Sequence, residues 1–266
     1  MKFVLSATRL IVCLAALALV AGCGSSVTFN DKDSPEKLYA DARDEMASGS
    51  YDKAIKMLER VEGRAAGTIL AQQAQLDMAY AQWRSGERAA SLSTLDRFIK
   101  VHPSSPALDY AMYLKGIVNF NDNLGILSSI SRQDITERDQ QASRDAYQAF
   151  KQLVDQFPDS KYSADARVRM DYIVNALAEY ELHVARYYYR RGAFLAAANR
   201  AQHTVREFQQ TPSVEEALYI LAQSYDKLGL NDLRDDADRV LKANYPDSRF
   251  LREGMRKRDS AWWVFW

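Results

Sequence analysis

Cys23 is the residue whose type and position most directly imply chemistry. It follows the apolar run from Leu10 to Ala21 and stands between Gly22 and Gly24. A cysteine thiol can carry a thioether-linked diacylglycerol, and an α-amine freed by cleavage before the cysteine can take a further acyl chain. Because each buried methylene contributes about 0.8 kcal/mol, two acyl chains hold a protein stably at a membrane. The residue and its position therefore indicate a lipid attachment site.

The segment before Cys23 has the composition of an export signal. Lys2 and Arg9 open it, and the apolar run that follows is shorter than the roughly 20 residues that a membrane-spanning helix needs. The sequence VAGC at 20–23 resembles the bacterial lipobox. Residues 1–22 are therefore predicted to be a cleaved lipoprotein signal peptide, and Cys23 is predicted to carry the N-palmitoyl and S-diacylglycerol groups.

Gly24, the residue after the predicted lipid attachment site, bears on location. In lipoprotein sorting an aspartate at that position usually means retention in the inner membrane, so Gly24 predicts the outer membrane, on its periplasmic side. Residues 23–33 are rich in small and polar side chains and are expected to form a lipidated flexible tether. Cys13 leaves with the signal and Cys23 is acylated, so the mature chain has no thiol for a disulfide.

The charge of the chain gives no sign of a nucleic-acid partner. The full chain has 35 basic and 35 acidic residues, and loss of Lys2 and Arg9 with the signal leaves 33 and 35. Nucleic-acid binding normally leaves a basic footprint, which is absent here. The 47% hydrophobic content is sufficient for a globular core, and the scarcity of glycine and proline favours helices.

Recurring turn residues reveal an internal repeat. Gly49 and Gly86 lie 37 residues apart, and so do Gly192 and Gly229. Each glycine separates two helical patterns, where a helix must stop and a positive φ is favoured. A second series of turns contains proline, which ends a helix: VHPSSP at 101–106, QFPDS at 156–160 and NYPDS at 244–248.

Between the turns the apolar residues have helical spacing, and no window alternates as a strand does. One stripe consists of Tyr51, Ala54, Ile55, Leu58 and Val61. Ser34 and Ser105, each before a proline, are expected to cap helices, and Ser213 with Glu216 has the spacing of a capping box. The sequence therefore predicts an all-α fold of helix pairs.

The pairs resemble the tetratricopeptide repeat, a helix–turn–helix unit of 34 residues. Five repeats fit the chain, which exceeds the three needed for a self-supporting stack and predicts a curved solenoid. The third repeat is interrupted by an insertion at about 121–141, and the fourth begins with an unusually long helix. We expect repeats one to three to occupy residues 34–158 and repeats four and five to occupy 159–250, followed by a basic and aromatic tail at 251–266.

No arrangement of residues indicates catalysis. The three histidines, His102, His183 and His203, stand apart from any metal-binding or nucleophile motif, and the chain has no P-loop, no G-x-S-x-G and no G-x-G-x-x-G. Paired acids such as Asp235 and Asp236 are typical of an exposed helix face. We therefore expect a protein that is not an enzyme and has neither a cofactor nor a metal.

Longer motifs identify a family. YELHVARYYYRRGAFLAAANR at 180–200 is the most distinctive, and QLDMAYA at 75–81, LDRFIKVHPSSP at 95–106, DYAMYLKG at 109–116 and FPDSKYSADA at 157–166 accompany it. With ERD at 137–139, these motifs resemble the BamD (ComL) family of outer-membrane lipoproteins over nearly the whole mature chain. The chain departs from the family pattern at Arg64-Ala65-Ala66-Gly67, where relatives have an aromatic-proline turn, and in its aromatic end.

The resemblance implies a role in inserting β-barrel proteins into the outer membrane. One half of the solenoid would capture unfolded barrel proteins through their aromatic C-terminal signal. The other half would dock on the periplasmic domains of BamA, with BamC and BamE as further partners. Arg200, in the matching AANR, is our candidate contact for BamA; the alternative is an ordinary solvated arginine.

The concave positions of the repeats predict where a peptide would bind. In tetratricopeptide families, repeat positions 2, 5, 9 and 12 face the concave side. These positions are rich in aromatic residues in repeats one to three and more polar in repeats four and five, which suits an extended aromatic peptide in the first three. The predicted groove residues are Tyr39, Arg43, Tyr80, Trp83, Tyr110, Tyr113 and Phe120, with Arg43 available to a terminal carboxylate. The alternative is that these rings pack between repeats.

Two questions remain open at the level of sequence. A tetratricopeptide pilotin or scaffold lipoprotein for a secretin could share the anchor and the repeats, although the insertion and the YYYRRGA helix favour the Bam role. The tail, SAWWVFW after a basic run, has three interpretations. It could cap the fifth repeat, enter the membrane interface, or occupy a groove of a partner or of the chain itself.

Overall fold

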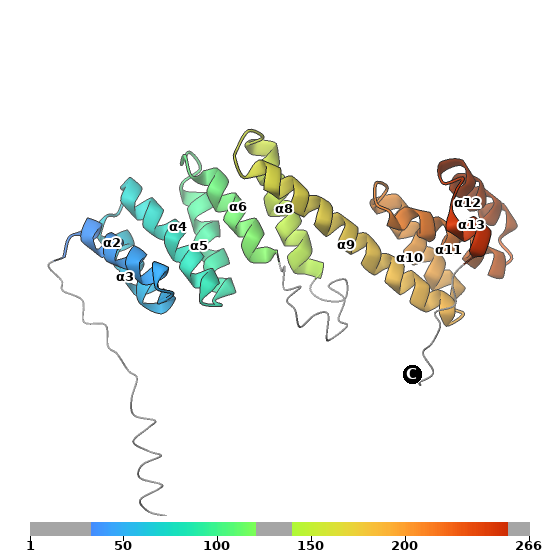
Figure 1. Ribbon diagram of the computed structural model, residues 1–266, viewed down its shortest axis with the longest axis horizontal. Helices are drawn as coiled ribbons and strands as arrows, with labels where there is room; N and C mark the ends of the chain where they lie inside the picture. The colour runs from blue at the N-terminus through green and yellow to red at the C-terminus, as the bar shows by residue number, and fades with distance from the viewer. Residues whose placement is uncertain (1–32, 121–139, 255–266) are drawn as a thin grey trace, which may run out of the picture. The chain divides into compact units, whose positions relative to one another are not determined.

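The structure is a computed structural model that describes residues 33–120 and 140–254 (Figure 1). Cys23, most of the predicted insertion and the tail beyond Gly254 lie outside these ranges. All regular structure within them is helical. The helices are α2 (Pro35–Ala47), α3 (Tyr51–Arg64), α4 (Ile69–Arg84), α5 (Arg88–Val101), α6 (Leu108–Asn119), α8 (Gln140–Gln156), α9 (Ser163–Arg190), α10 (Phe194–Glu207), α11 (Ser213–Lys227), α12 (Asn231–Asn244) and α13 (Arg249–Glu253).

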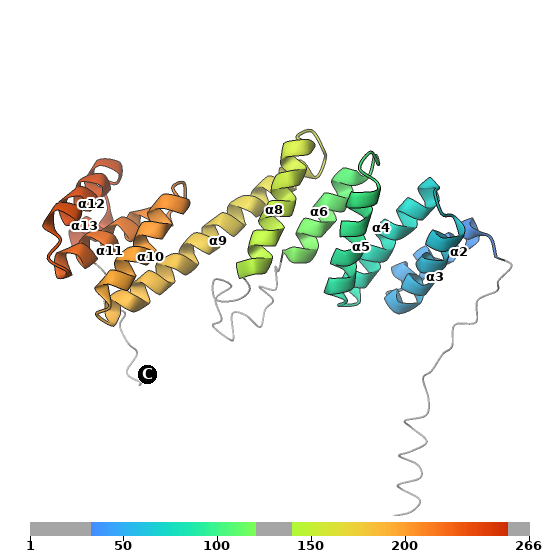
Figure 2. The ribbon, with the colours of Figure 1, turned by 180° about the vertical axis from the view of Figure 1, so that it is seen from behind.

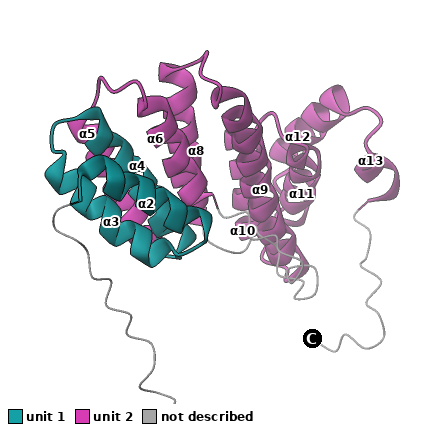
Figure 3. Cartoon of the chain, turned by 60° about the vertical axis from the view of Figure 1, so that its left-hand side comes forward, with its two compact units in different colours: residues 1–87 teal, residues 88–266 magenta. Residues whose placement is uncertain are grey.

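The helix order confirms the all-α prediction and its repeats. The chain divides into two compact units, residues 1–87 and 88–266 (Figure 3). Within each unit, every described helix up to α12 contacts the next, and two pairs of first helices, α2 with α4 and α9 with α11, contact each other. This neighbour-only packing is that of helical repeats. The predicted functional division after residue 158 concerns a different boundary and stays a prediction.

The predicted glycine turns are confirmed. Gly49, Gly86, Gly192 and Gly229 have φ values of 82°, 91°, 77° and 72°. A side chain disfavours this left-handed conformation, whereas glycine adopts it readily. At the first of these turns the amide of Ser50 donates to the carbonyl of Glu45 over 2.8 Å, which closes the end of α2.

The unit formed by residues 1–87 has its own core. Leu38 of α2, Leu58 and Val61 of α3, and Met78 of α4 are buried together. The stripe predicted on α3 is thus the face that packs, and full burial of each large aliphatic side chain contributes about 1.5–3 kcal/mol. Ser34 caps α2 as predicted, accepting from the amide of Lys37.

The segment Arg64-Ala65-Ala66-Gly67 ends α3 and leads into α4. Gly67 has a φ of 82°, and Thr68 then caps α4 by accepting from the amide of Ala71 over 3.2 Å. A positive-φ glycine and a threonine cap therefore make the turn between α3 and α4.

Helix α9 links the packing of the third repeat to that of the last two. Its 28 residues confirm the unusually long helix predicted for repeat four. Ala166 and Ile173 join the core of α6 and α8, whereas Leu182 and Ala185 join that of α10 and α11. Figures 1 and 2 show α9 running from beside α8 to beside α10 and α11. One rigid element thus supports both ends of this unit.

Two of the predicted helix caps are wrong. Helix α6 begins at Leu108, so Ser105 lies before the cap position, which Ala107 occupies. Ser213 is already the first residue of α11 and makes no capping bond. The capping box fails because Glu216 is engaged with an arginine of α9 instead of the local backbone. Within the described ranges, no helix is both long and apolar enough to cross a membrane.

Candidate binding surfaces

Tyr39 and Arg43 of α2 meet α4 at Asp77. The hydroxyl of Tyr39 donates to Oδ2 of Asp77 over 2.6 Å, and both side chains are partly buried. Arg43, one turn along α2, is exposed beside this pair. A guanidinium has five N–H donors, so Arg43 can face its neighbours and still present donors to a ligand carboxylate.

Burial and this contact change the acidity of all three groups. Burial, followed by the hydrogen bond to Asp77, raises the pKa of the Tyr39 phenol to about 12. Burial also raises the pKa of the Asp77 carboxyl above its ordinary value, although Tyr39 and Arg43 oppose the effect. Contact with the Tyr39 hydroxyl raises the pKa of Arg43. The guanidinium therefore remains a fixed positive charge at this surface.

Tyr80 and Trp83 continue the surface along α4. Their ring centroids are 5.8 Å apart in an edge-on arrangement. Arg84 lies over the rings of Tyr51 and Tyr80 and donates from Nη1 to the Tyr80 hydroxyl over 2.8 Å. Tyr39, Arg43, Tyr80 and Trp83 thus form what we call the α2–α4 surface, on which half-buried rings alternate with exposed cations. The structure brings these four predicted residues onto two contacting helices.

The other three predicted groove residues pack against α9 or against Tyr162, the residue just before it. Tyr113 stacks on Tyr162 with centroids 4.8 Å apart, and Tyr110 lies 5.5 Å from the same ring. Phe120 makes an edge contact with Tyr172 at 5.7 Å. We call this row of five rings the α6–α9 surface. Four of the rings are partly buried, and the fifth, Tyr172, is 39% exposed. The row is therefore both packed and accessible.

Polar groups tie the α6–α9 surface together. The hydroxyl of Tyr113 donates to Oδ2 of Asp165 over 2.7 Å, and Arg169 binds the same oxygen. Burial would raise the pKa of the Asp165 carboxyl, but the bonds from Arg169 and Tyr113 together hold it below its ordinary value. The guanidinium of Arg169 also lies 5.0 Å from the centre of the Phe120 ring. At this distance the ring quadrupole attracts the guanidinium, which helps to hold Arg169 against Phe120.

The sequence analysis did not predict the residues that α9 contributes to this surface, namely Asp165, Arg169 and Tyr172. Applied to repeat four, the concave positions 2, 5, 9 and 12 give one set on the long helix, namely Glu179, Leu182, Arg186 and Tyr189. The same spacing of i, i+3, i+7 and i+10 recurs earlier, and it selects Tyr162, Asp165, Arg169 and Tyr172. A 28-residue helix has room for two sets, so its length was the signal that would have revealed them.

The concave positions of repeats four and five are occupied by contacts within the chain. Arg186 forms a forked pair with Glu216 of α11, with Nη2 2.7 Å from Oε2, and its Nη1 binds Glu179 at 2.7 Å. Burial alone would lower the pKa of the Arg186 guanidinium, but its bonds to Glu216 and Glu179 outweigh burial and raise it. Tyr219 stacks on Phe250 of α13 with ring centroids 5.5 Å apart and is partly exposed.

Arg200 forms one ion pair within the chain and is also partly exposed to solvent. Its Nη1 donates to Oε2 of Glu181 on α9 over 2.9 Å. The Glu181 side chain is 5% exposed and that of Arg200 is 44% exposed. The arginine therefore neutralises a buried acid and presents part of its guanidinium outwards. The interpretation of Arg200 as an ordinary solvated arginine omits this contact, which no local pattern encodes because the partners come from different helices.

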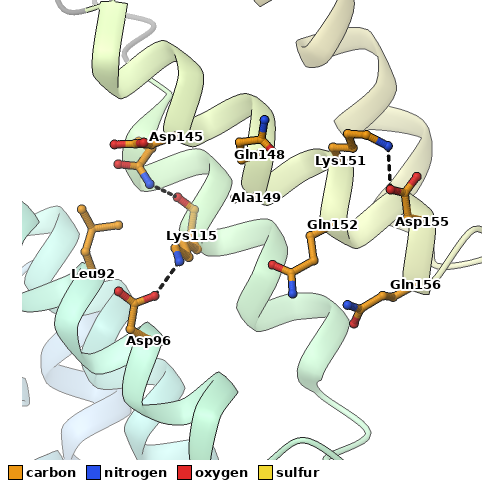
Figure 4. A pocket seen from close by; sticks show the side chains of 11 residues that line it. Leu92, Asp96, Lys115, Asp145, Gln148, Ala149, Lys151, Gln152, Asp155 and Gln156 are labelled. Carbon is orange, nitrogen blue, oxygen red and sulfur yellow. Dashed lines mark hydrogen bonds and ion pairs between the residues drawn. The ribbon is translucent and has the colours of Figure 1, made fainter.

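A polar groove between α5, α6 and α8, of about 540 Å³, was not predicted (Figure 4). Lys115 pairs with Asp96 at 2.6 Å, and Lys151 pairs with Asp155 at 2.7 Å. The remaining lining is mostly glutamine and other polar side chains. Asp145 adds a third acid to the two ion pairs, and the lining has no aromatic side chain, so the groove does not match the ligand expected for the two aromatic surfaces.

Fold and surfaces together place the chain in the class of helical-repeat proteins with tetratricopeptide-like pairs. The model of the family YfiO, described as an outer membrane lipoprotein, matches residues 31–241, and the chain belongs to this family. The resemblance inferred from residues 180–200 is thereby confirmed.

Relatives match over nearly their full length. The chain is 44% identical over 266 residues to "outer membrane protein assembly factor BamD" of Neisseria meningitidis serogroup B (strain MC58), covering 100% of both chains. It is 34% identical over 245 residues to the protein of that name from Xylella fastidiosa (strain Temecula1), covering 91% of this chain and 84% of the relative. The Haemophilus influenzae protein is 33% identical over 231 residues, covering 87% and 88%.

Proposed function

We propose that this chain is a lipid-anchored component of the Bam complex that binds unfolded β-barrel proteins on their way into the outer membrane. The full-length similarity to relatives named as BamD is the observation that supports the proposal most. Acylation of Cys23 would hold the chain at the inner face of that membrane, and residues 23–33 would serve as a tether.

The two aromatic surfaces suit the ligand that this role requires. The ends of unfolded barrel proteins are extended and rich in aromatic residues, as the family resemblance implies. Half-buried tyrosines offer a flat apolar face and a hydroxyl for the peptide backbone. Arg43 offers a bidentate donor to a terminal carboxylate. We place substrate binding on the α2–α4 surface and on the α6–α9 surface.

Partner docking is assigned to repeats four and five. The half-exposed guanidinium of Arg200 and the buried carboxylate of Glu181 form a paired charged feature on α10 and α9. We propose that it contacts the periplasmic domains of BamA, with BamC and BamE as further partners.

A pull-down from detergent-solubilised envelope tests the role. A tagged full-length chain, expressed at its native level, should co-purify with a large outer-membrane barrel subunit that carries periplasmic domains. A matched tagged chain with Cys23→Ser lacks the lipid anchor and is mislocalised. Proteins that co-purify with both chains attach to a mislocalised chain as well, and are therefore not evidence for the role. Recovery of a secretin in place of that subunit would contradict the Bam role and favour the pilotin alternative.

Crosslinking should place the substrate peptide on the predicted surfaces. With photoreactive residues at positions 80, 113 and 219, a peptide ending in a barrel signal should be captured mainly at 80 and 113, since these two positions lie on the α2–α4 and α6–α9 surfaces and position 219 lies on neither. Arg43→Met should weaken capture of the peptide with a free carboxylate and leave capture of its amidated form unchanged. Preferential capture at 219 would contradict the placement.

Arg200 should be required for co-purification of BamA. Arg200→Glu alone is a poor test, because it would set a second acid against buried Glu181 and disturb the fold. The double variant Glu181→Gln, Arg200→Gln removes both charges and keeps side chains that can hydrogen-bond. We expect it to release BamA while the helical circular-dichroism signal and the melting temperature stay close to those of the native chain. Glu181→Gln alone, which retains Arg200, should keep BamA; unchanged co-purification of the double variant would remove Arg200 from the interface.

A further inference from the structure

The groove between α5, α6 and α8 contains three glutamines that have no hydrogen-bond partner among the described residues. Gln148, Gln152 and Gln156 stand one turn apart on α8, and all three are exposed (Figure 4). Each carboxamide has two N–H donors and an oxygen that accepts. The three side chains can therefore pair with both the carbonyl and the N–H groups of a polypeptide backbone, which are unpaired when the backbone is extended.

The buried part of the groove lining is held by hydrogen bonds within the chain. Asn119 at the end of α6 is 3% exposed. Its Oδ1 accepts from Nη2 of Arg88 over 3.0 Å, and its Nδ2 donates to the carbonyl of Lys115 over 3.2 Å. A site whose base is already ordered costs a ligand less conformational entropy than a surface that must rearrange.

The dimensions of the groove suit a short stretch of extended chain. Its α8 wall runs from Asp145 to Gln156, which corresponds to about 16 Å at the helical rise per residue. An extended chain advances about 3.3 Å per residue, so about five residues fit along this wall. All lining residues belong to the compact unit of residues 88–266, so one unit supplies the whole site.

The charges of the lining select the kind of segment. Its two lysines are each paired with an aspartate. Asp145, the third acid, accepts over 2.9 Å from the neutral side chain of Gln141 and makes no ion pair with a described residue. The excess charge is therefore negative, which attracts a lysine or arginine of a ligand and repels an acid. Within the described ranges, no three acids, histidines or cysteines are grouped so that they could hold a metal ion, which favours a peptide cation.

We propose that this groove binds an extended polypeptide segment of about five residues that carries a lysine or arginine. The glutamines of α8 bind its backbone, and Asp145 binds its cation. No aromatic side chain is required, because the lining has no aromatic wall. Binding here is independent of the α2–α4 and α6–α9 surfaces, and therefore of the barrel-protein role proposed above.

Nuclear magnetic resonance of the mature chain with Cys23→Ser tests the site, because it detects binding even at millimolar affinity. The probes are a blocked pentapeptide of serine and asparagine with a central lysine, and the same peptide with a central glutamate. The lysine peptide should shift the side-chain amide signals of Gln148, Gln152 and Gln156, and should bind at least about fivefold more tightly than the glutamate peptide. The signal of Gln202, an exposed glutamine of α10, should stay in place. Groove signals that do not shift at millimolar lysine peptide would overturn the proposal.

A triple variant tests the backbone contacts. Replacing the three exposed glutamines of α8 by alanine, as Gln148→Ala, Gln152→Ala, Gln156→Ala, should weaken binding of the lysine peptide about tenfold or more, because several hydrogen bonds are lost together. Gln202→Ala is the matched control and should leave the affinity unchanged. An affinity that is the same in the triple variant and the control would show that the peptide does not bind along α8.

Two variants with opposite expected effects test the role of charge. Asp145→Asn should remove the preference for lysine over glutamate. Lys151→Gln releases Asp155 from its pair at 2.7 Å and should tighten binding of the lysine peptide, about threefold. Glu59→Gln, which removes an exposed acid of α3, should change neither value. A lysine preference that survives Asp145→Asn, or weaker binding after Lys151→Gln, would contradict the assignment of the cation site.

Discussion

Replacing Phe150 by alanine should lower the free energy of unfolding by about 3–5 kcal/mol, the range for removing a large aromatic side chain from a core. Phe150 is fully buried between α6, α8 and α9. The centroid of its ring lies 6.1 Å from that of Tyr113 and 6.3 Å from that of Phe120, so it packs against both rings of the α6–α9 surface. Urea unfolding measures the loss. Peptide capture at position 113 should fall, whereas capture at position 80, in the other compact unit, should persist.

Gly116 provides the matched test of this packing. A Cβ atom at this position would lie 2.3 Å from Cε1 of Phe150, too close for the ring to remain where it is. Gly116→Ala should therefore destabilise the chain by about 1–3 kcal/mol, despite the better helix propensity of alanine. With Phe150→Leu already present, the same substitution should become neutral or stabilising. Equal costs in the two backgrounds would show that the two residues are not coupled.

Replacing Arg186 by methionine should cost about 3 kcal/mol, near the lower end of the range for breaking a buried ion pair, since the side chain is a quarter exposed. The loss arises because Glu216, a buried residue, keeps its charge without its forked partner. Urea unfolding of the mature chain checks this value. The change should also loosen the junction of α9 with α11 and reduce co-purification of BamA.

Two controls show whether the unpaired charge is the cause. Arg186→Met combined with Glu216→Met removes both charges and should regain most of the lost stability. Arg206→Met breaks an exposed pair with Glu207 and should change stability by less than about 0.5 kcal/mol. If the double methionine variant were as unstable as Arg186→Met, lost packing would explain the effect better than lost charge.

Local patterns predicted most of the fold. Glycines at Gly49, Gly86, Gly192 and Gly229, and prolines after α5, α8 and α12, mark where helices end because they act on the backbone at their own position. The apolar stripe of α3 is buried as expected. Caps were predicted less well: Ser34 caps its helix, whereas Ser105 and Ser213 do not.

The candidate sites were predicted only in part, because their contacts join distant residues. Tyr39 was expected at a concave position, but its partner Asp77 lies on another helix. Glu216 was assigned to a capping box, yet it binds Arg186, 30 positions earlier in the chain. Arg200 was chosen from a motif that gives no sign of its bond to Glu181. Repeat spacing predicts which face a side chain shares, whereas its partner across helices depends on packing.

The most direct test of the proposed function is depletion of the chain in its own cell, followed by quantification of every β-barrel protein in the outer membrane. An assembly factor acts on all barrels, so their levels should fall together while lipoproteins outside the Bam complex remain. Re-expression of the native chain should restore them, and the chain with Cys23→Ser should restore them poorly. Loss of a single secretin with all other barrels unchanged would contradict the assignment and identify a pilotin instead.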